Sequence, residues 1–139
     1  MMGSAETVAQ GFVRAINHGD LDELAELMTR DHRFVDSLSL VAEGRERVKA
    51  AWADYFYVVP DYTIAVQEIL CEGPVAVILG VVRGTYAPDG EMDPKNKWET
   101  PAAFRALIAD GKVAEWRVFA DNEPMRKLAQ NTATASCPA

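Results

Sequence analysis

The sequence predicts a single α+β domain in which three N-terminal helices pack on a strongly curved, mostly antiparallel sheet. Two observations predict this fold class. Before Pro60, apolar residues recur mainly at helical spacing, whereas four long apolar stretches separated by turn signals follow Asp61. The chain has 139 residues, of which 49% are hydrophobic and 25% charged. It is therefore long enough to bury the core of one domain.

Two helices are predicted to open the chain. Apolar residues recur at helical spacing from Ala5 to Ile16, and Gly19 then supplies the left-handed residue that commonly ends a helix. Asp20 is followed three residues later by Glu23, which resembles a capping box. A second helix is therefore predicted from about residue 21 to about residue 29.

The spacing then changes from helical to alternating. Phe34–Leu40 reads as a half-buried strand, and the row that faces the core contains one carboxylate, Asp36. After Gly44, the apolar residues from Val48 to Phe56 predict a third helix. This helix must end before Pro60, because proline disfavours α geometry in the residue before it.

Four strands of an antiparallel meander are predicted after Pro60, at 62–70, 75–86, 97–108 and 113–120. Gly80 and Gly84 lie inside the second of them and predict bulges or bends, which curve a sheet. A short helix is expected around 123–128. We expect the domain to span 1–130 and the small, polar residues 131–139 to form a disordered tail. The concave face of such a sheet, partly closed by helices, predicts a deep pocket.

Charge and cysteine content exclude several classes of partner. The chain has 14 Lys and Arg against 21 Asp and Glu, a net charge of −7, so it would repel nucleic acid and anionic membranes. No stretch is long and apolar enough to cross a membrane or to resemble a signal peptide. Cys71 and Cys137 lie far apart and do not demand a disulfide, which fits a reducing compartment. We therefore expect a cytoplasmic protein that binds neither nucleic acid nor membrane.

The motifs that are missing narrow the chemistry. The only histidines, His18 and His32, are 14 positions apart, and no Cys-x-x-Cys or His-x-His occurs, so no metal site is expected. No Gly-x-Ser-x-Gly elbow, phosphate-binding loop or dinucleotide fingerprint is present either. Proton transfer without a cofactor is the enzymatic chemistry most compatible with these residues.

Several stretches in the first 60 positions carry a family resemblance. Phe12–Leu24, Asp31–Asp36, Gly44 and Trp52 resemble the cone-shaped superfamily that includes nuclear transport factor 2, ketosteroid isomerases and SnoaL-like polyketide cyclases. The resemblance implies a cone-shaped fold. It does not select a function, because this scaffold carries isomerases, cyclases, dehydratases, epoxide hydrolases and plain binding modules.

Two aspartates are the candidate acid and base. Asp36 is a carboxylate on the core face of a strand, and ketosteroid isomerases carry their general base at the matching position; alternatively, it pairs with an arginine or caps a loop. Asp121 follows the last predicted strand, where SnoaL-like cyclases place an acid/base aspartate. Its alternative role is the N-cap of the following helix.

Other polar residues are candidates for assisting roles. His32 is either a proton shuttle near Asp36 or a surface histidine in the loop that enters the first strand. Arg83 and Arg105 lie within apolar strands and could neutralise a buried aspartate. An arginine and aspartate set would also suit an epoxide hydrolase that activates water.

The aromatic content predicts a ring-containing or polyketide-like ligand. The residues expected to line its site are Phe12, Trp52, Tyr55, Trp98 and Phe119. Phe12 stands where ketosteroid isomerases have the tyrosine of their oxyanion hole, and their second donor falls near Ala102 and Ala103. A true steroid isomerase is therefore not expected, because neither position could donate a hydrogen bond.

Together, these observations predict a cofactor-independent acid/base enzyme of the isomerase, cyclase or hydratase type. It would act on a small, largely apolar molecule, with Asp36 and Asp121 as base and acid and His32 assisting. The alternatives are a non-catalytic small-ligand binding protein and an epoxide hydrolase-like enzyme. A homodimer through the outer face of the sheet is also expected, because strands such as 75–82 are apolar on both faces.

Overall fold

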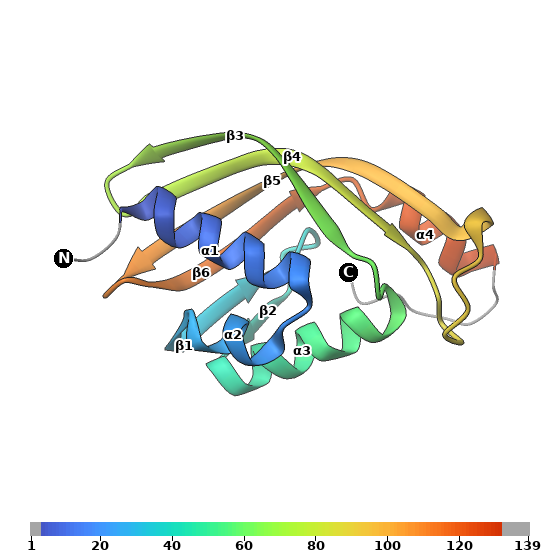
Figure 1. Cartoon of the computed structure of the whole chain (residues 1–139), viewed down its shortest axis with the longest axis horizontal. Helices are drawn as coiled ribbons and strands as arrows, with labels where there is room; N and C mark the ends of the chain where they lie inside the picture. Colours follow the sequence, from blue (N-terminus) through green and yellow to red (C-terminus); the bar gives the residue numbers. More distant parts are fainter. Residues whose placement is uncertain (1–3, 132–139) are drawn as a thin grey trace.

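The protein has an α+β fold with four helices and a six-stranded mixed sheet, in a computed structural model that describes residues 4–131. The strand order is β2-β1-β6-β5-β4-β3, and α1, α2 and α3 lie on one side of the sheet (Figure 1). No helix among the described residues is long and apolar enough to span a membrane. The elements are α1 (Ala5–His18), α2 (Leu21–Glu26), β1 (Met28–Val35), β2 (Val41–Glu43), α3 (Arg45–Val58), β3 (Thr63–Glu72), β4 (Val75–Thr85), the short 3-10 helix η1 (Pro94–Asn96), β5 (Lys97–Ala109), β6 (Lys112–Ala120) and α4 (Glu123–Asn131).

The end of α1 and the start of α2 lie where their caps predict. Gly19 adopts a left-handed conformation (φ 64°) and donates its N–H to carbonyls of the last turn of α1. Asp20 Oδ1 then accepts the N–H of Glu23 at 3.0 Å and caps α2. However, α2 ends at Glu26 rather than near residue 29. The next residues join the sheet instead, and the Val113 N–H of β6 donates to the Leu27 carbonyl at 2.7 Å.

The first strand differs most from its prediction. It begins at Met28 and ends at Val35, so the predicted strand 34–40 is wrong beyond its first two residues. The chain turns at Asp36–Ser39 and returns as β2, which leaves Leu38 63% and Leu40 64% exposed. In addition, β1 pairs with β6 in parallel, so the sheet is mixed, while the other four strand pairs are antiparallel, in agreement with the predicted mostly antiparallel sheet.

The meander of β3, β4, β5 and β6 is antiparallel throughout, as its turn signals predict. A Cβ on Gly80 would lie 2.3 Å from the Ala65 carbonyl oxygen, so only glycine fits there. The register irregularity beside it lies in β3, between Val66 and Glu68. The third helix ends at Val58, two residues before Pro60, as predicted.

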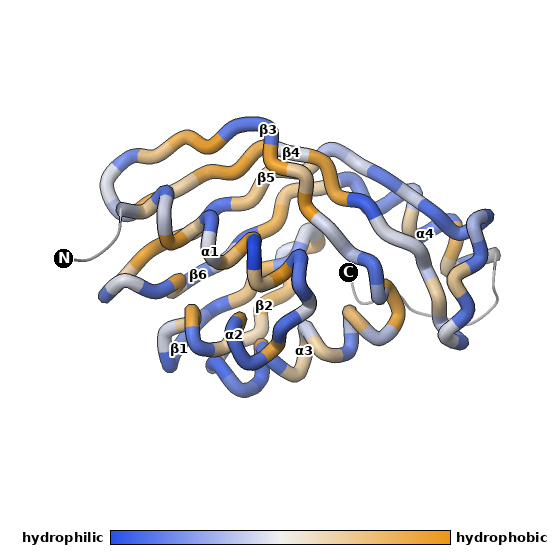
Figure 2. The backbone as a smooth tube through the Cα atoms, in the orientation of Figure 1, coloured by the Kyte–Doolittle hydropathy of each residue, from blue (hydrophilic) through white to orange (hydrophobic). Residues whose placement is uncertain are grey.

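The core lies between the helices and the inner face of the sheet. Phe12 of α1 packs on Trp116 of β6 with ring centroids 4.8 Å apart, and Trp116 stacks on Phe104 of β5 at 5.1 Å. All three side chains are fully buried. Apolar residues run along the central strands and α1 (Figure 2).

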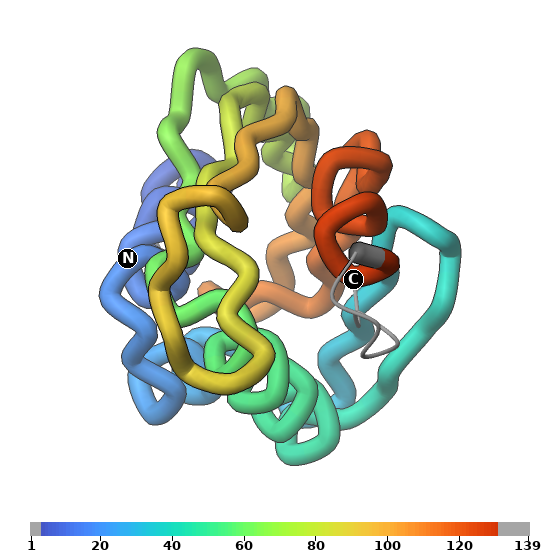
Figure 3. The backbone as a smooth tube through the Cα atoms, turned by 90° about the vertical axis from the view of Figure 1, so that its right-hand side faces the viewer, coloured from blue at the N-terminus to red at the C-terminus, as the bar shows by residue number. Residues whose placement is uncertain are grey.

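Two polar contacts join elements that are far apart in the sequence. Asn17, in the last turn of α1, donates to the Ile64 carbonyl at 3.0 Å and accepts the Ile64 N–H at 2.8 Å. The Asn122 side chain also donates to the Ser37 hydroxyl. This second contact places the start of α4 beside the β1–β2 turn (Figure 3).

Candidate functional site

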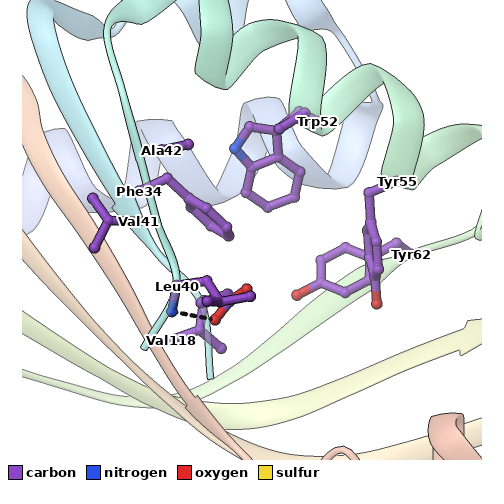
Figure 4. A pocket seen from close by; sticks show the side chains of 10 residues that line it. Phe34, Leu40, Val41, Ala42, Trp52, Tyr55, Tyr62 and Val118 are labelled. Atoms are coloured by element: carbon purple, nitrogen blue, oxygen red, sulfur yellow. Dashed lines mark hydrogen bonds between the residues drawn. The ribbon is translucent and has the colours of Figure 1, made fainter. Parts of the chain in front are cut away.

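A cavity of about 300 Å³ lies between α3, the β1–β2 hairpin, the start of β3 and β6 (Figure 4). Its walls are mostly apolar. Five aliphatic residues line it together with four aromatic ones, Phe34, Trp52, Tyr55 and Tyr62. Among the described residues that line it, Asp36 is the only charged one. A cavity of this size and polarity is typical of a site for a small organic molecule.

The position of Asp36 is set by the turn that it starts. It is the first residue after β1, and its Oδ1 accepts the N–H groups of Leu38 at 2.8 Å and Leu40 at 2.9 Å. The second of these bonds is drawn in Figure 4. Asp36 therefore caps a loop, as one alternative predicts, and also lines the cavity. Within residues 4–131, its other carboxylate oxygen receives no hydrogen bond and forms no ion pair.

Tyr62 brings a second polar group to the cavity. Its side chain is 8% exposed, and Figure 4 shows its hydroxyl directed toward the middle of the cavity. Burial raises the pKa of the Tyr62 phenol, so the hydroxyl keeps its proton throughout the neutral range. Among the described residues the hydroxyl has no hydrogen-bond partner, so it is available to a ligand as a donor.

Tyr62 is not among the residues that the sequence predicts as ligand contacts. One signal could have found it, since Tyr62 stands in the same alternating row as Ile64, which is 3% exposed and faces the core. The neighbouring Asp61 fixes the chain here, because its carboxylate accepts both the N–H and the hydroxyl of Thr85 at 2.7 Å. The backbone before β3 is therefore tied to the end of β4.

Trp52 is the central ring of the cavity wall. It is 5% exposed and packs against Phe34 at 5.7 Å, Phe56 at 5.4 Å and Tyr62 at 6.0 Å between ring centroids. Tyr55, one turn further along α3, meets Tyr62 at 5.1 Å with the ring planes 81° apart. The sequence singled out Trp52 and Tyr55 as ligand-binding residues, and both line the cavity.

His32 lies in the core, not in the cavity lining. It stands inside β1, fully buried, so its interpretation as a surface histidine in a loop is wrong. Its Nδ1 lies 2.6 Å from the Val113 carbonyl oxygen, and its ring stacks on Phe12 at 5.9 Å. Burial lowers the pKa of His32, which keeps the imidazole neutral. Phe12, also predicted to contact ligand, is likewise a core residue away from the cavity lining.

Asp121 is not brought to the cavity lining. Its side chain accepts the Glu123 N–H at 2.9 Å, at the start of α4, in agreement with its alternative role as a helix cap. In the parallel pairing of β1 with β6, Val35 stands opposite Arg117, so Asp121 lies three residues beyond the position level with Asp36. At about 3.3 Å per residue, this offset is roughly 10 Å along the strand direction.

The remaining predicted residues lie outside the cavity lining. Phe119 is 50% exposed on the outer face of the sheet, because it alternates with Val118, which faces the cavity. Trp98 touches Tyr62 at 6.5 Å between ring centroids but borders a separate hollow at the ends of β3, β4 and β5. Arg83 and Arg105 form ion pairs with Glu99 at 2.8 Å and with Glu115 at 3.1 Å, outside the cavity lining.

Within the described part of the chain, no three His, Cys, Asp or Glu side chains come together as a site for a metal ion. The cavity lining combines the Asp36 carboxylate, held by backbone N–H groups, with the protonated Tyr62 phenol, a second phenol on Tyr55 and mostly apolar walls. These are the parts of a site for binding a small organic molecule and for exchanging a proton with it.

Solved structures with the same fold are numerous. A protein of Shewanella putrefaciens assigned as a SnoaL-like polyketide cyclase superimposes with a TM-score of 0.79, at 16% identity, over 94% of this chain and 99% of that one. IdmH of Streptomyces antibioticus, assigned as a polyketide cyclase, gives a TM-score of 0.73 at 23% identity over 91% and 98% of the two chains.

A third similar structure holds a small ligand. This protein of Catenulispora acidiphila has a ketosteroid isomerase-like fold and is in complex with trimethylamine. It superimposes with a TM-score of 0.70 at 15% identity, over 81% of this chain and 83% of that one. At such identities, the three structures show the fold alone.

The sequence itself carries the family assignment. No curated protein matches the chain. The model of the SnoaL-like domain, however, matches residues 9–116, which include most of α1, all of α3, the cavity-lining Asp36 and most of the sheet. This match extends over well more than half of the chain, which therefore belongs to the SnoaL-like domain family.

Proposed function

We propose that the cavity is the active site of a cofactor-independent acid/base enzyme that acts on a small, largely apolar organic molecule by isomerisation, cyclisation or hydration. One observation carries this proposal. Asp36 presents a carboxylate oxygen without a partner among the described residues to a cavity whose other walls are uncharged. A general base needs an acceptor atom that is free of other partners and lies within hydrogen-bond reach of the substrate.

Asp36 and Tyr62 divide the chemistry between them. The two backbone N–H groups fix the Asp36 carboxylate, whose second oxygen accepts the proton from the substrate. The Tyr62 hydroxyl, kept protonated by burial, donates a hydrogen bond to the substrate oxygen on which negative charge develops. Asp121 has no part in this proposal, because it does not line the cavity and its carboxylate accepts the Glu123 N–H.

Hydrogen exchange into candidate substrates tests the proposal without knowledge of the product. The purified protein is incubated in D2O with a panel of small cyclic and aromatic ketones, and deuterium uptake at carbon is followed by mass spectrometry. The wild-type protein is expected to accelerate uptake into at least one ketone. Asp36→Asn is expected to lower that rate by about a hundredfold or more while ligand affinity stays within a few-fold.

Asp54→Asn is the matched control, because Asp54 lies exposed on α3 and does not line the cavity. This variant carries the same change of charge and should keep the wild-type rate. Equal rates for the wild-type protein and Asp36→Asn would contradict the proposal that Asp36 is the base.

The second candidate function is binding of a small molecule without turnover. It is favoured by the single carboxylate in the lining, since binding needs no second acid. The trimethylamine complex of the Catenulispora acidiphila protein shows that this fold can hold a small organic molecule. A binding protein would show no deuterium uptake with any ketone, and Asp36→Asn would change only its affinity. Mass spectrometry of a molecule that copurifies with the protein would identify the ligand in both cases.

A further inference from the structure

We propose that the ligand of the cavity is an organic cation, a protonated alkylamine whose nitrogen lies against Asp36. This inference rests on the proposed function, because it names the chemical class of molecule that occupies the same cavity. It concerns the charge of the ligand, and it assigns the second Asp36 oxygen to the ligand nitrogen instead of to a substrate proton, so it deepens the second candidate function, binding without turnover.

The cavity lining carries one negative charge that no positive charge of the lining neutralises within residues 4–131. Asp36 is the only charged residue that borders the cavity within residues 4–131, and no lysine, arginine or histidine of that region borders it. Asp36 is half-buried, so a wholly apolar ligand that covered its second oxygen would displace water from it and leave this oxygen without a partner, which costs free energy. A ligand with a positive charge removes this cost, because it replaces the lost water with an ion pair.

The number of free acceptor positions also favours an amine. Asp36 Oδ1 is already engaged by the N–H groups of Leu38 and Leu40, at 2.8 and 2.9 Å. The other oxygen can accept the single N–H that a protonated tertiary amine offers. A guanidinium or a primary ammonium would bring more donors than this one oxygen can satisfy, and the cavity walls supply few other acceptors.

Four aromatic side chains line the same cavity as the Asp36 carboxylate and also favour a cation. Phe34, Trp52 and Tyr62 form successive pairs whose ring planes are inclined by 65°, and Tyr55 meets Tyr62 at 81°. All four rings line the cavity, and rings in such edge-to-face pairs cover one another less than rings in parallel stacks do. A ring face carries partial negative charge and attracts a cation, and tryptophan does so most strongly.

The charge of the whole chain acts in the same direction. With a net charge of −7, the protein attracts cations from solution and repels anions. The charge of the lining, the acceptor geometry, the aromatic walls and the overall field thus agree on a positively charged ligand.

A pair of probes with the same shape but different charge tests this inference. Protonated dimethylaminoethanol and isoamyl alcohol have the same heavy-atom skeleton, in which N–H replaces C–H and carries the positive charge. Each is titrated into the full-length wild-type protein near neutral pH, and binding is followed by NMR shifts of the residues that line the cavity. We expect the amine to bind at least about tenfold more tightly than the alcohol.

Two variants locate the source of the preference. Asp36→Asn keeps an oxygen that can accept the Leu38 and Leu40 N–H groups but removes the charge, so the two probes should then bind within about twofold of each other. Asp54→Asn removes the same charge from the exposed face of α3 and should leave the tenfold preference in place. The comparison of the two probes on the wild-type protein needs no variant, so it tests whether the cavity prefers a cation even if Asp36→Asn fails to fold.

The outcomes separate this inference from the proposed function. If isoamyl alcohol shifts the lining residues and the amine binds no more tightly, the ligand is not a cation, but the cavity remains a site for a small apolar molecule. If the preference for the amine survives in Asp36→Asn, the overall charge explains it and the assignment to Asp36 is overturned. If neither probe shifts the lining residues, the inference fails, and so does the proposed use of this cavity.

Discussion

At the scale of single residues, a substitution at Tyr62 should affect the proposed activity much more than the stability of the fold. Its ring packs against Trp52 and Tyr55, but its hydroxyl forms no hydrogen bond within the described residues. Tyr62→Phe should therefore change the free energy of unfolding by less than about 1 kcal/mol. If Tyr62 donates to a developing oxyanion, the same change should slow deuterium uptake by about a hundredfold. Urea denaturation and the D2O assay measure the two effects, and a rate unchanged in Tyr62→Phe would rule out the donor role.

The burial of His32 predicts that the free energy of unfolding depends on pH. Burial lowers the pKa of His32 in the folded protein, whereas in the unfolded chain it returns to about 6.5. Below this value the unfolded state binds a proton that the folded state does not, so the free energy of unfolding decreases as the pH falls from about 6.5 toward the lower folded pKa. Above about 6.5 both states are neutral at this residue, and His32 contributes no slope.

Urea denaturation at several pH values between about 7.5 and 5 measures this effect. His32→Met should flatten the pH dependence in that window, while His18→Gln, at the end of α1, serves as the control and should leave it unchanged. A slope that persists in His32→Met would assign the pH dependence to other groups.

At the scale of secondary-structure elements, Asn17 ties α1 to β3. It forms two hydrogen bonds with the Ile64 backbone, at 3.0 and 2.8 Å, where the strand leaves α3. Asn17→Ala would leave both Ile64 groups without partners in a partly buried place and should cost about 2 kcal/mol of the free energy of unfolding. Gln10→Ala, on the exposed face of the same helix, is the control and should cost less than about 0.5 kcal/mol. Chemical denaturation of the two variants decides between a structural role for Asn17 and none.

The close approach of β4 to β3 at Gly80 leads to a second prediction, on the stability of a glycine variant. Because a Cβ on Gly80 would lie 2.3 Å from the Ala65 carbonyl oxygen, Gly80→Ala forces the two strands apart and should cost about 1–3 kcal/mol. The matched substitution is Gly11→Ala in α1, where the nearest atom to the new Cβ is the end of the Arg14 side chain at 3.7 Å. That variant should be as stable as the wild type or more so, by up to about 1 kcal/mol. Thermal unfolding of both proteins tests the contrast.

At the scale of the whole molecule, no other element within residues 4–131 covers several apolar side chains on the outer face of the sheet. Phe119 on β6 is 50% exposed and Leu70 on β3 is 53% exposed, while Leu79 on β4 is only partly buried. A second copy of the chain would cover these residues, so we predict a homodimer at micromolar concentrations, measured by analytical ultracentrifugation. Phe119→Glu should shift the population to monomers, whereas Leu38→Glu, on the β1–β2 turn, should not. Sedimentation of the wild-type protein as a monomer would contradict this prediction.

The sequence by itself determined most secondary-structure elements, because their signals are local. Gly19 and Asp20 mark the break between α1 and α2, Pro60 limits α3, and the turn residues bound the strands of the meander. Each depends on a backbone preference or on a hydrogen bond within a few residues, which the order of residues alone encodes. The α+β class and the resemblance to the SnoaL-like family were predicted for the same reason, and the family match confirms the second.

Only the tertiary structure decided which side chains border the cavity. The alternation of residues 34–40 predicts that Leu38 and Leu40 lie in the core, yet both are exposed. The chain turns at Asp36 because Oδ1 of this residue caps the turn. In addition, β6 pairs with β1 only as far as Val35 and not with the residues after it. The parallel pairing of β1 with β6 joins segments about 80 residues apart, and no local signal predicts its register. That register separates Asp121 from Asp36 along the strands. It also places the His32 ring against Phe12 of α1, while Tyr62 lines the cavity from the position just before β3. Sequence spacing can identify the residue types that suit proton transfer, but contacts between distant segments decide which of them meet.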